Sequence, residues 1–286
     1  MYIKLFKFDI KNGLLKNKVL LSASLIIPII LCIDYIIKVK GITFGQEVTL
    51  SFADYYMYIF GGVKEGVVFG MKDYIPSPTT NFIMPIMWSI VFITLFYGTL
   101  NYPFNDMSGI GKQILIRTKG RISWWISKCI WNLICCLFFF SIILGVIWIF
   151  CLITGAEISG KINVQLLNSV YNTKIEEIDG NNILMPVYMF VLPIIVTSAI
   201  SIMQMTISLF IKPIFSFLVT VVLLVFSAYV LSPCLIGNFL ILIRFDYIVA
   251  NGLNFYMGIF VSIFVIVCSI IIGVLKFRHY DIINKE

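Results

Sequence analysis

Long apolar runs separated by polar connections dominate the pattern of this chain. A helix rises about 1.5 Å per residue, so about 20 apolar residues are needed to cross a hydrocarbon core of about 30 Å. The runs of sufficient length predict six transmembrane helices, which form a domain over residues 19–286 and lie at Val19–Ile37, Phe82–Leu100, Cys129–Thr154, Leu184–Phe210, Pro213–Leu231 and Phe255–Leu275. The predicted fold class is therefore an all-α integral membrane protein.

Residues 1–18 show a different, amphipathic pattern. At about 100° per residue, one arc of a helix carries apolar residues and the neighbouring arc carries lysines. This pattern predicts an interfacial helix on an anionic lipid surface, with contacts from Lys4, Phe6, Lys7, Ile10 and Lys11. The alternative is a basic tail that only sets the orientation of the chain in the membrane.

Three connections on one side of the predicted membrane differ in character. The first contains Tyr55–Gly70, a half-apolar, glycine-rich stretch that predicts a loop or short helix resting partly on the membrane. The second, Gly155–Ile183, is mostly polar and acidic and predicts an exposed loop. In the third, the apolar piece Leu235–Ile243 is too short to span, so Ser232–Asn254 is expected to form a re-entrant or interfacial hairpin between the fifth and sixth spans.

The connection Asn101–Lys128 between the second and third spans carries the most detailed pattern. The short polar side chains of Asn105–Gly109 predict a helix start, because such side chains cap exposed amides. Gly111–Arg117 then predicts one to two helical turns. We expect a cytosolic coupling helix that a soluble partner pushes, with contact residues Asp106, Met107, Gly111, Lys112, Leu115 and Arg117. The alternative is a positively charged loop that only sets topology.

The composition agrees with a membrane environment. Of the 286 residues, 60% are hydrophobic and 12% are charged, and the mean hydropathy is +1.01. A soluble domain carries about 25% charged residues and cannot cover this much apolar surface. We therefore expect a multi-pass protein of the cell membrane with the bilayer as its main solvent.

The net charge of +7 does not indicate nucleic-acid binding, because the basic residues form no continuous face. They follow the positive-inside rule instead, and this predicts that both termini are cytoplasmic. That orientation places 14 of the 21 basic residues on the inner side: Lys4, Lys7, Lys11, Lys16, Lys18, Lys112, Arg117, Lys119, Arg121, Lys128, Lys212, Lys276, Arg278 and Lys285. The opposite orientation would invert the rule.

The sequence lacks the residue patterns of common catalytic sites. A single histidine, His279, excludes the paired-histidine zinc motif. Asp34 is the one acid in a predicted span, which excludes paired-carboxylate chemistry. Residues 109–112 are no phosphate-binding loop, because Asp106 replaces its first glycine and Gln113 follows its lysine. We expect no catalytic residue, metal or cofactor in this chain, and an energy source in another protein.

Polar residues inside the spans are the remaining candidates for function. Asp34 lies near the outer interface, where it either pairs with Lys38 or attracts cationic cargo in a vestibule. The fourth span carries a polar stripe at helical spacing, formed by Thr197, Ser201, Gln204 and Ser208. Because lipid does not favour such a stripe, it faces other helices or a cargo pathway. Packing and cargo contact explain it about equally well.

The chain resembles the ABC-2 type permeases, the membrane subunits of exporters of the type V fold. The resemblance rests on the layout of six spans with an amino-terminal interfacial helix, a coupling helix and a hairpin. It also rests on the basic, aromatic run Arg117–Lys128 and the tail Lys276–Ile283, a basic cluster followed by Asp281 and aliphatic residues.

This resemblance implies a second permease, either a copy or a paralogue, and two copies of a cytosolic ABC ATPase that hold ATP and Mg²⁺. It implies export of amphipathic or hydrophobic cargo, with peptides favoured, as in peptide-toxin exporters and lantibiotic-immunity permeases. The alternative is a non-transporting immunity or sensor protein of the membrane that binds a toxic peptide.

Overall fold

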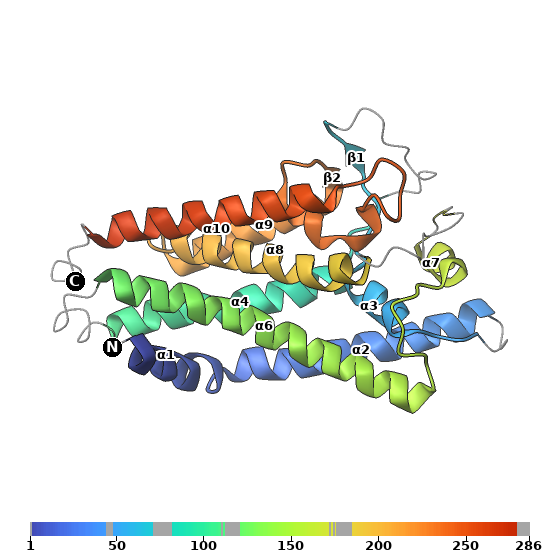
Figure 1. Cartoon of the computed structure of the whole chain (residues 1–286), viewed down its shortest axis with the longest axis horizontal. Coiled ribbons are helices and arrows are strands. Elements are labelled where there is room, and N and C mark those ends of the chain that lie inside the picture. The colour runs from blue at the N-terminus through green and yellow to red at the C-terminus, as the bar shows by residue number, and fades with distance from the viewer. Residues whose placement is uncertain are drawn as a thin grey trace.

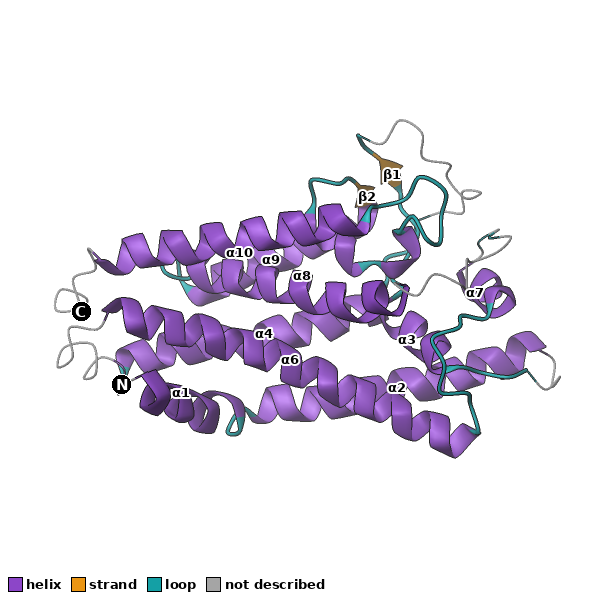
Figure 2. Ribbon diagram, in the orientation of Figure 1, coloured by secondary structure: helices purple, strands orange, loops and turns teal. Residues whose placement is uncertain are grey.

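The computed structural model describes residues 2–43, 48–70, 82–109, 111, 121–171, 173, 175 and 185–278. The described chain is mostly helical, and its long helices pack into one elongated bundle (Figures 1 and 2). The helices are α1 (Tyr2–Asp9), α2 (Lys18–Thr43), α3 (Phe52–Phe60), α4 (Ile86–Ser108), α6 (Arg121–Thr154), α7 (Val164–Tyr171), α8 (Met185–Ile207), α9 (Pro213–Tyr229) and α10 (Phe255–Arg278).

Shorter elements complete the chain. A π-helical turn, Ile10–Leu14, follows α1, and two 3₁₀ turns, Ile236–Leu240 and Leu242–Arg244, follow α9. The strands β1 (Val67–Val68) and β2 (Val230–Leu231) pair in parallel.

Five of the described helices, α2, α4, α6, α8 and α10, are long and apolar enough to cross a membrane, and α9 is apolar but has 17 residues. The architecture is consistent with an all-α membrane protein. Each predicted apolar run is helical over most of its length. The run Pro213–Leu231 does not remain helical to its end, because the chain leaves α9 for β2 at Val230.

The exposed surface of the bundle is apolar, which supports contact with lipid. In α10, for example, Phe260 and Phe264 are exposed, whereas Ser262 and Ser269 are buried against other helices. This distribution is the reverse of a soluble helix, where polar residues face outward. It agrees with the expectation that the bilayer solvates the long helices.

The two ends of the bundle contain different elements (Figure 1). We call one the α1 end, because α1, the end of α4, the start of α6 and the end of α10 lie there. We call the opposite one the α7 end, which holds α3, α7, β1, β2 and the two 3₁₀ turns. Basic residues lie in three of these segments: α1, the start of α6 and the end of α10. The predicted topology places this end in the cytoplasm.

Three predictions about the connections need correction. Asn105–Gly109 does not begin a helix, because α4 continues through Asn105 to Ser108 and Gly109 ends it. The helix continues because the carboxylate of Asp106 finds a buried cationic partner, described below. In the predicted coupling helix, Gly111 is helical, whereas Lys112, Leu115 and Arg117 lie outside the described residues.

The segment predicted as an exposed loop, Gly155–Ile183, contains the helix α7. The side chain of Asn163 accepts hydrogen bonds from the amides of Gln165 and Leu166 at the start of this helix. Leu166 and Leu167 are buried against the bundle, so α7 packs onto it. Burial of these two leucines outweighs the polar character of the surrounding residues.

The Tyr55–Gly70 stretch begins within α3, a short helix whose side chains are almost all buried in the protein rather than resting on its surface. Ser51 and Asp54 cap its start reciprocally.

The segment Ser232–Asn254 was predicted as a re-entrant or interfacial hairpin between the fifth and sixth spans. It forms the two 3₁₀ turns, both buried. Arg244 fixes this segment by donating hydrogen bonds to the carbonyls of Val63, Ser227 and Ala228 and to the side chain of Asn238.

Candidate functional site

A buried cluster of charged residues lies at the α1 end. Lys128 of α6 forms ion pairs with Asp9 of α1 and Asp106 of α4, and its Nζ lies 2.7 Å from the Oδ2 atom of Asp106. The Lys128 side chain is 1% exposed, and both carboxylates are buried. The cluster therefore joins three elements that are distant in sequence. A buried charge of this kind is retained only with close partners, because desolvation is costly.

Neutral donors complete the cluster. Tyr102 and Ser127 donate hydrogen bonds to the two oxygens of Asp9, at 2.7 and 2.6 Å. The indole of Trp124 donates to Asp106 at 3.0 Å. The ammonium group of Lys128 also lies 4.5 Å from the centre of the Tyr102 ring and 5.1 Å from that of Trp124. These contacts offset the loss of hydration of the three charges.

The turn after α1 approaches the bundle very closely. A Cβ atom on Gly13 would lie 2.5 Å from Nε1 of Trp131 and 2.6 Å from the Tyr102 ring, so only glycine fits. The neighbouring Leu14 is buried. The first helix is therefore held against α4 and α6 through Asp9 and this turn.

The predicted interfacial residues divide into two groups. Phe6 and Ile10 are half-buried, whereas Lys7 and Lys11 are exposed. The side chain of Lys4 lies outside the described residues. The sequence pattern did not predict that Asp9 anchors this helix. Asp9 is, however, a lone acid within a lysine-rich amphipathic stretch, and this could have indicated a special role.

Of the predicted coupling residues, Asp106 belongs to the cluster, and Gly111 and Met107 lie beside it. A Cβ atom on Gly111 would lie 2.5 Å from both the backbone oxygen and the Oδ2 atom of Asp106. The connection between α4 and α6 therefore touches the cluster directly at Gly111. Met107 packs with Trp124 and Trp125 at the start of α6. A force applied to this connection would act directly on Asp106 in the charged cluster.

The polar stripe of α8 faces other helices. Ser201 shares a hydrogen bond of 3.0 Å with Thr99 of α4, and Gln204 donates to the carbonyl of Phe96 at 3.0 Å. Thr197 and Ser208 bond to carbonyls of α8 itself. These contacts match the packing alternative for the stripe.

Asp34 lies at the α7 end of α2. Its carboxylate forms an ion pair of 3.2 Å with Lys38 and accepts a hydrogen bond from Tyr58. These contacts match the alternative in which Asp34 pairs with Lys38. Its partners Lys38 and Tyr58 line a cavity at the α7 end. Asp34 is not part of the polar stripe of α8.

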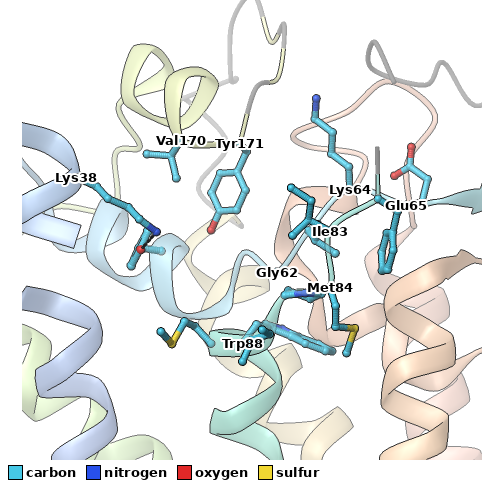
Figure 3. A pocket seen from close by; sticks show the side chains of 15 residues that line it. Lys38, Gly62, Lys64, Glu65, Ile83, Met84, Trp88, Val170 and Tyr171 are labelled. Atoms are coloured by element: carbon cyan, nitrogen blue, oxygen red, sulfur yellow. Dashed lines mark hydrogen bonds between the residues drawn. The ribbon is translucent and has the colours of Figure 1, made fainter. Parts of the chain in front are cut away.

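The cavity at the α7 end has a volume of about 510 Å³ (Figure 3). Its lining comes from the end of α2, from α3, from residues 62–65, from residues 82–88 and from the end of α7. Part of Tyr55–Gly70 thus forms one of its walls.

The described residues contain no group of three or more histidine, cysteine or acidic side chains that could hold a metal ion.

The fold and the buried cluster define a class: a helical protein with membrane-spanning features and an ion-paired anchor at one end. Residues 25–283 match the family model described as "Protein of unknown function (DUF2705)", and the chain belongs to this family. No curated protein and no solved structure matches the chain.

Proposed function

We propose that this chain is the membrane-spanning permease subunit of an ATP-driven ABC exporter. In this proposal it lies in the cell membrane with both termini in the cytoplasm and moves amphipathic or hydrophobic cargo, with peptides favoured. Two copies of a separate cytosolic ATPase bind ATP and Mg²⁺, and a second permease, a copy or a paralogue, completes the complex.

The contact between Gly111 and Asp106 is the observation that carries this proposal. An ATPase that pushes on the connection between α4 and α6 would load Asp106 first. Because Asp106 is tied to Lys128 and, through it, to Asp9, the load would reach α6 and α1 together. Separating these buried charges is costly, so the three elements are expected to move as one rigid body.

The distribution of charge supports the orientation in this proposal. The exposed lysines Lys7 and Lys11 and the connection that starts at Gly109 lie at the same end of the bundle (Figure 1). A cytosolic ATPase needs its contact surface at the end that the positive-inside rule assigns to the cytoplasm.

Purification from native membranes tests the proposal. A tagged chain should co-purify with a nucleotide-binding subunit, and the complex should hydrolyse ATP faster when an amphipathic peptide is added. Reconstituted vesicles should then move the peptide only with ATP present. A chain that purifies without an ATPase and transports peptide without ATP would contradict the proposal.

The second candidate function is a non-transporting immunity or sensor protein. The cavity favours it, because Tyr58 and Gly62–Glu65 build one wall of this candidate ligand site at the α7 end. In that case the connection at Gly111 has no mechanical role. The same purification distinguishes the two candidates, since a binder would bring down peptide but no ATPase.

A further inference from the structure

The cavity at the α7 end is large enough for a ligand. Its volume of about 510 Å³ lies within the range of about 300–1,000 Å³ that is common for ligand pockets. Figure 3 shows Trp88 and Met84 at its floor and Tyr171 reaching in from α7, while Lys64 extends away from the floor.

The polar groups of the aromatic walls already have partners within the protein. The indole of Trp88 donates to the carbonyl of Leu240 at 3.1 Å, and the hydroxyl of Tyr171 donates to that of Met57 at 2.8 Å. The hydroxyl of Tyr58 bonds to the carboxylate on α2. These rings therefore offer mainly apolar surface to a ligand. A ligand would bind by burying its own apolar groups.

Charges around the cavity balance locally. On one side Lys38 is paired with Asp34, with 3.2 Å between the ammonium and carboxylate groups. On the other side Lys64 and Glu65 are neighbours of opposite charge. Among the described lining residues, a highly charged ligand finds no surface of opposite charge. The lining suits a ligand with an uncharged, apolar body, and Met84 adds an adaptable side chain to the floor.

One wall of the cavity leads directly into a strand. Residues 62–66 precede β1, which pairs with β2, and these two strands form the whole sheet in the part of the chain that the structure describes. Each strand of a two-stranded sheet has an outer edge, and an extended peptide can add to such an edge. Phe69, just after β1, is 70% exposed. The edge of β1 lies a few residues along the chain from the lining residues 62–65. Main-chain hydrogen bonding at this edge would favour an extended peptide over an acyl chain.

We infer that the cavity binds apolar side chains of an extended peptide whose main chain runs along β1. This inference rests on the proposed function, in which the α7 end is the outer end of the bundle and peptide cargo leaves the protein there. It assigns that role to the cavity.

The test measures binding by the full-length chain alone, in lipid nanodiscs and without ATPase. The probe is a fluorescently labelled peptide of alternating leucine and serine, read by fluorescence anisotropy. Met84→Trp and Val170→Trp fill the cavity from two different walls. Ile158→Trp adds the same bulk at a position that is 61% exposed and outside the lining. Both filling variants should bind about tenfold more weakly, and Ile158→Trp should bind like the unchanged chain.

Several outcomes would overturn the inference. One is unchanged affinity in both filling variants when their thermal unfolding matches that of the unchanged chain. Another is equal affinity for a peptide of the same composition with its leucines at helical spacing, because the extended form would then be irrelevant. Tighter binding of palmitate with displacement of the peptide would assign the cavity to a lipid chain instead. Failure of all peptides to bind would refute the inference while leaving co-purification with an ATPase as a separate test of the proposed function.

Discussion

Asp9 on the first helix and Lys128 on α6 form a buried ion pair although 119 positions separate them in sequence. Asp106 makes a second pair with the same lysine. One ammonium group thus pairs with carboxylates from two other elements. This arrangement makes the lysine the most sensitive member of the cluster.

Lys128→Met should destabilise the protein by about 3–5 kcal/mol, because it leaves two carboxylates buried without their cation. Unfolding by SDS titration in mixed micelles measures the loss. Lys212→Met is the matched control, since Lys212 is exposed, and it should change the free energy of unfolding little. Equal stability of the two variants would contradict the role of the cluster.

Asp9→Asn should release α1 without unfolding the bundle. The neutral amide loses the ion pair with Lys128, so residues 2–14 should exchange their amide hydrogens much faster while α6 stays protected. Lys7→Gln changes a charge on the exposed side of the same helix and should leave exchange unaltered. Hydrogen exchange with mass spectrometry makes this comparison. Unchanged protection of α1 in Asp9→Asn would show that Gly13 and Leu14 hold it alone.

Gly111→Ala should impair coupling under the proposed function. The new methyl group would meet the oxygens of Asp106 at 2.5 Å and push the connection away from the cluster. We expect about a tenfold loss of peptide-stimulated ATP hydrolysis, equivalent to about 1.4 kcal/mol, with normal amounts of protein in the membrane. Gly145→Ala in α6 meets no atom within 4 Å and serves as the control. Full activity of Gly111→Ala would argue against force transfer at this point.

Arg244→Lys should destabilise the α7 end even though it keeps the charge. Lysine cannot reproduce the fork of hydrogen bonds to Val63, Ser227 and Ala228, and a cost of about 2–4 kcal/mol is expected. Arg278→Lys, at an exposed position, is the control. Thermal unfolding in detergent compares the two. A similar melting temperature for both variants would mean that the hydrogen bonds contribute little.

The helices were predictable because apolar runs of this length have few alternatives. Their ends were not. The helix α4 extends past Leu100 to Ser108, and α6 begins at Arg121 rather than at Cys129. In both cases polar residues remain helical because a charged residue, Asp106 or Lys128, finds a partner in another element. A pattern of hydrophobicity along the chain carries no information about such partners.

The candidate sites were predictable only in part. Local spacing singled out Asp106 and Gly111, which do lie together. It did not reveal Asp9, because pairing across 119 positions leaves no periodic signal. The cavity at the α7 end was not predicted either, because its walls come from five separate segments that the whole fold brings together.

The short helix α9 has a consequence for the surrounding membrane. At about 1.5 Å per residue its 17 residues cover about 25 Å, less than a hydrocarbon layer of about 30 Å. The guanidinium of Arg244 donates hydrogen bonds to the carbonyls of Ser227 and Ala228 in the last turn of α9. These backbone groups are therefore satisfied within the protein, away from acyl chains. Lipids next to α9 would then be compressed on that flank, giving the protein a preference for thin bilayers.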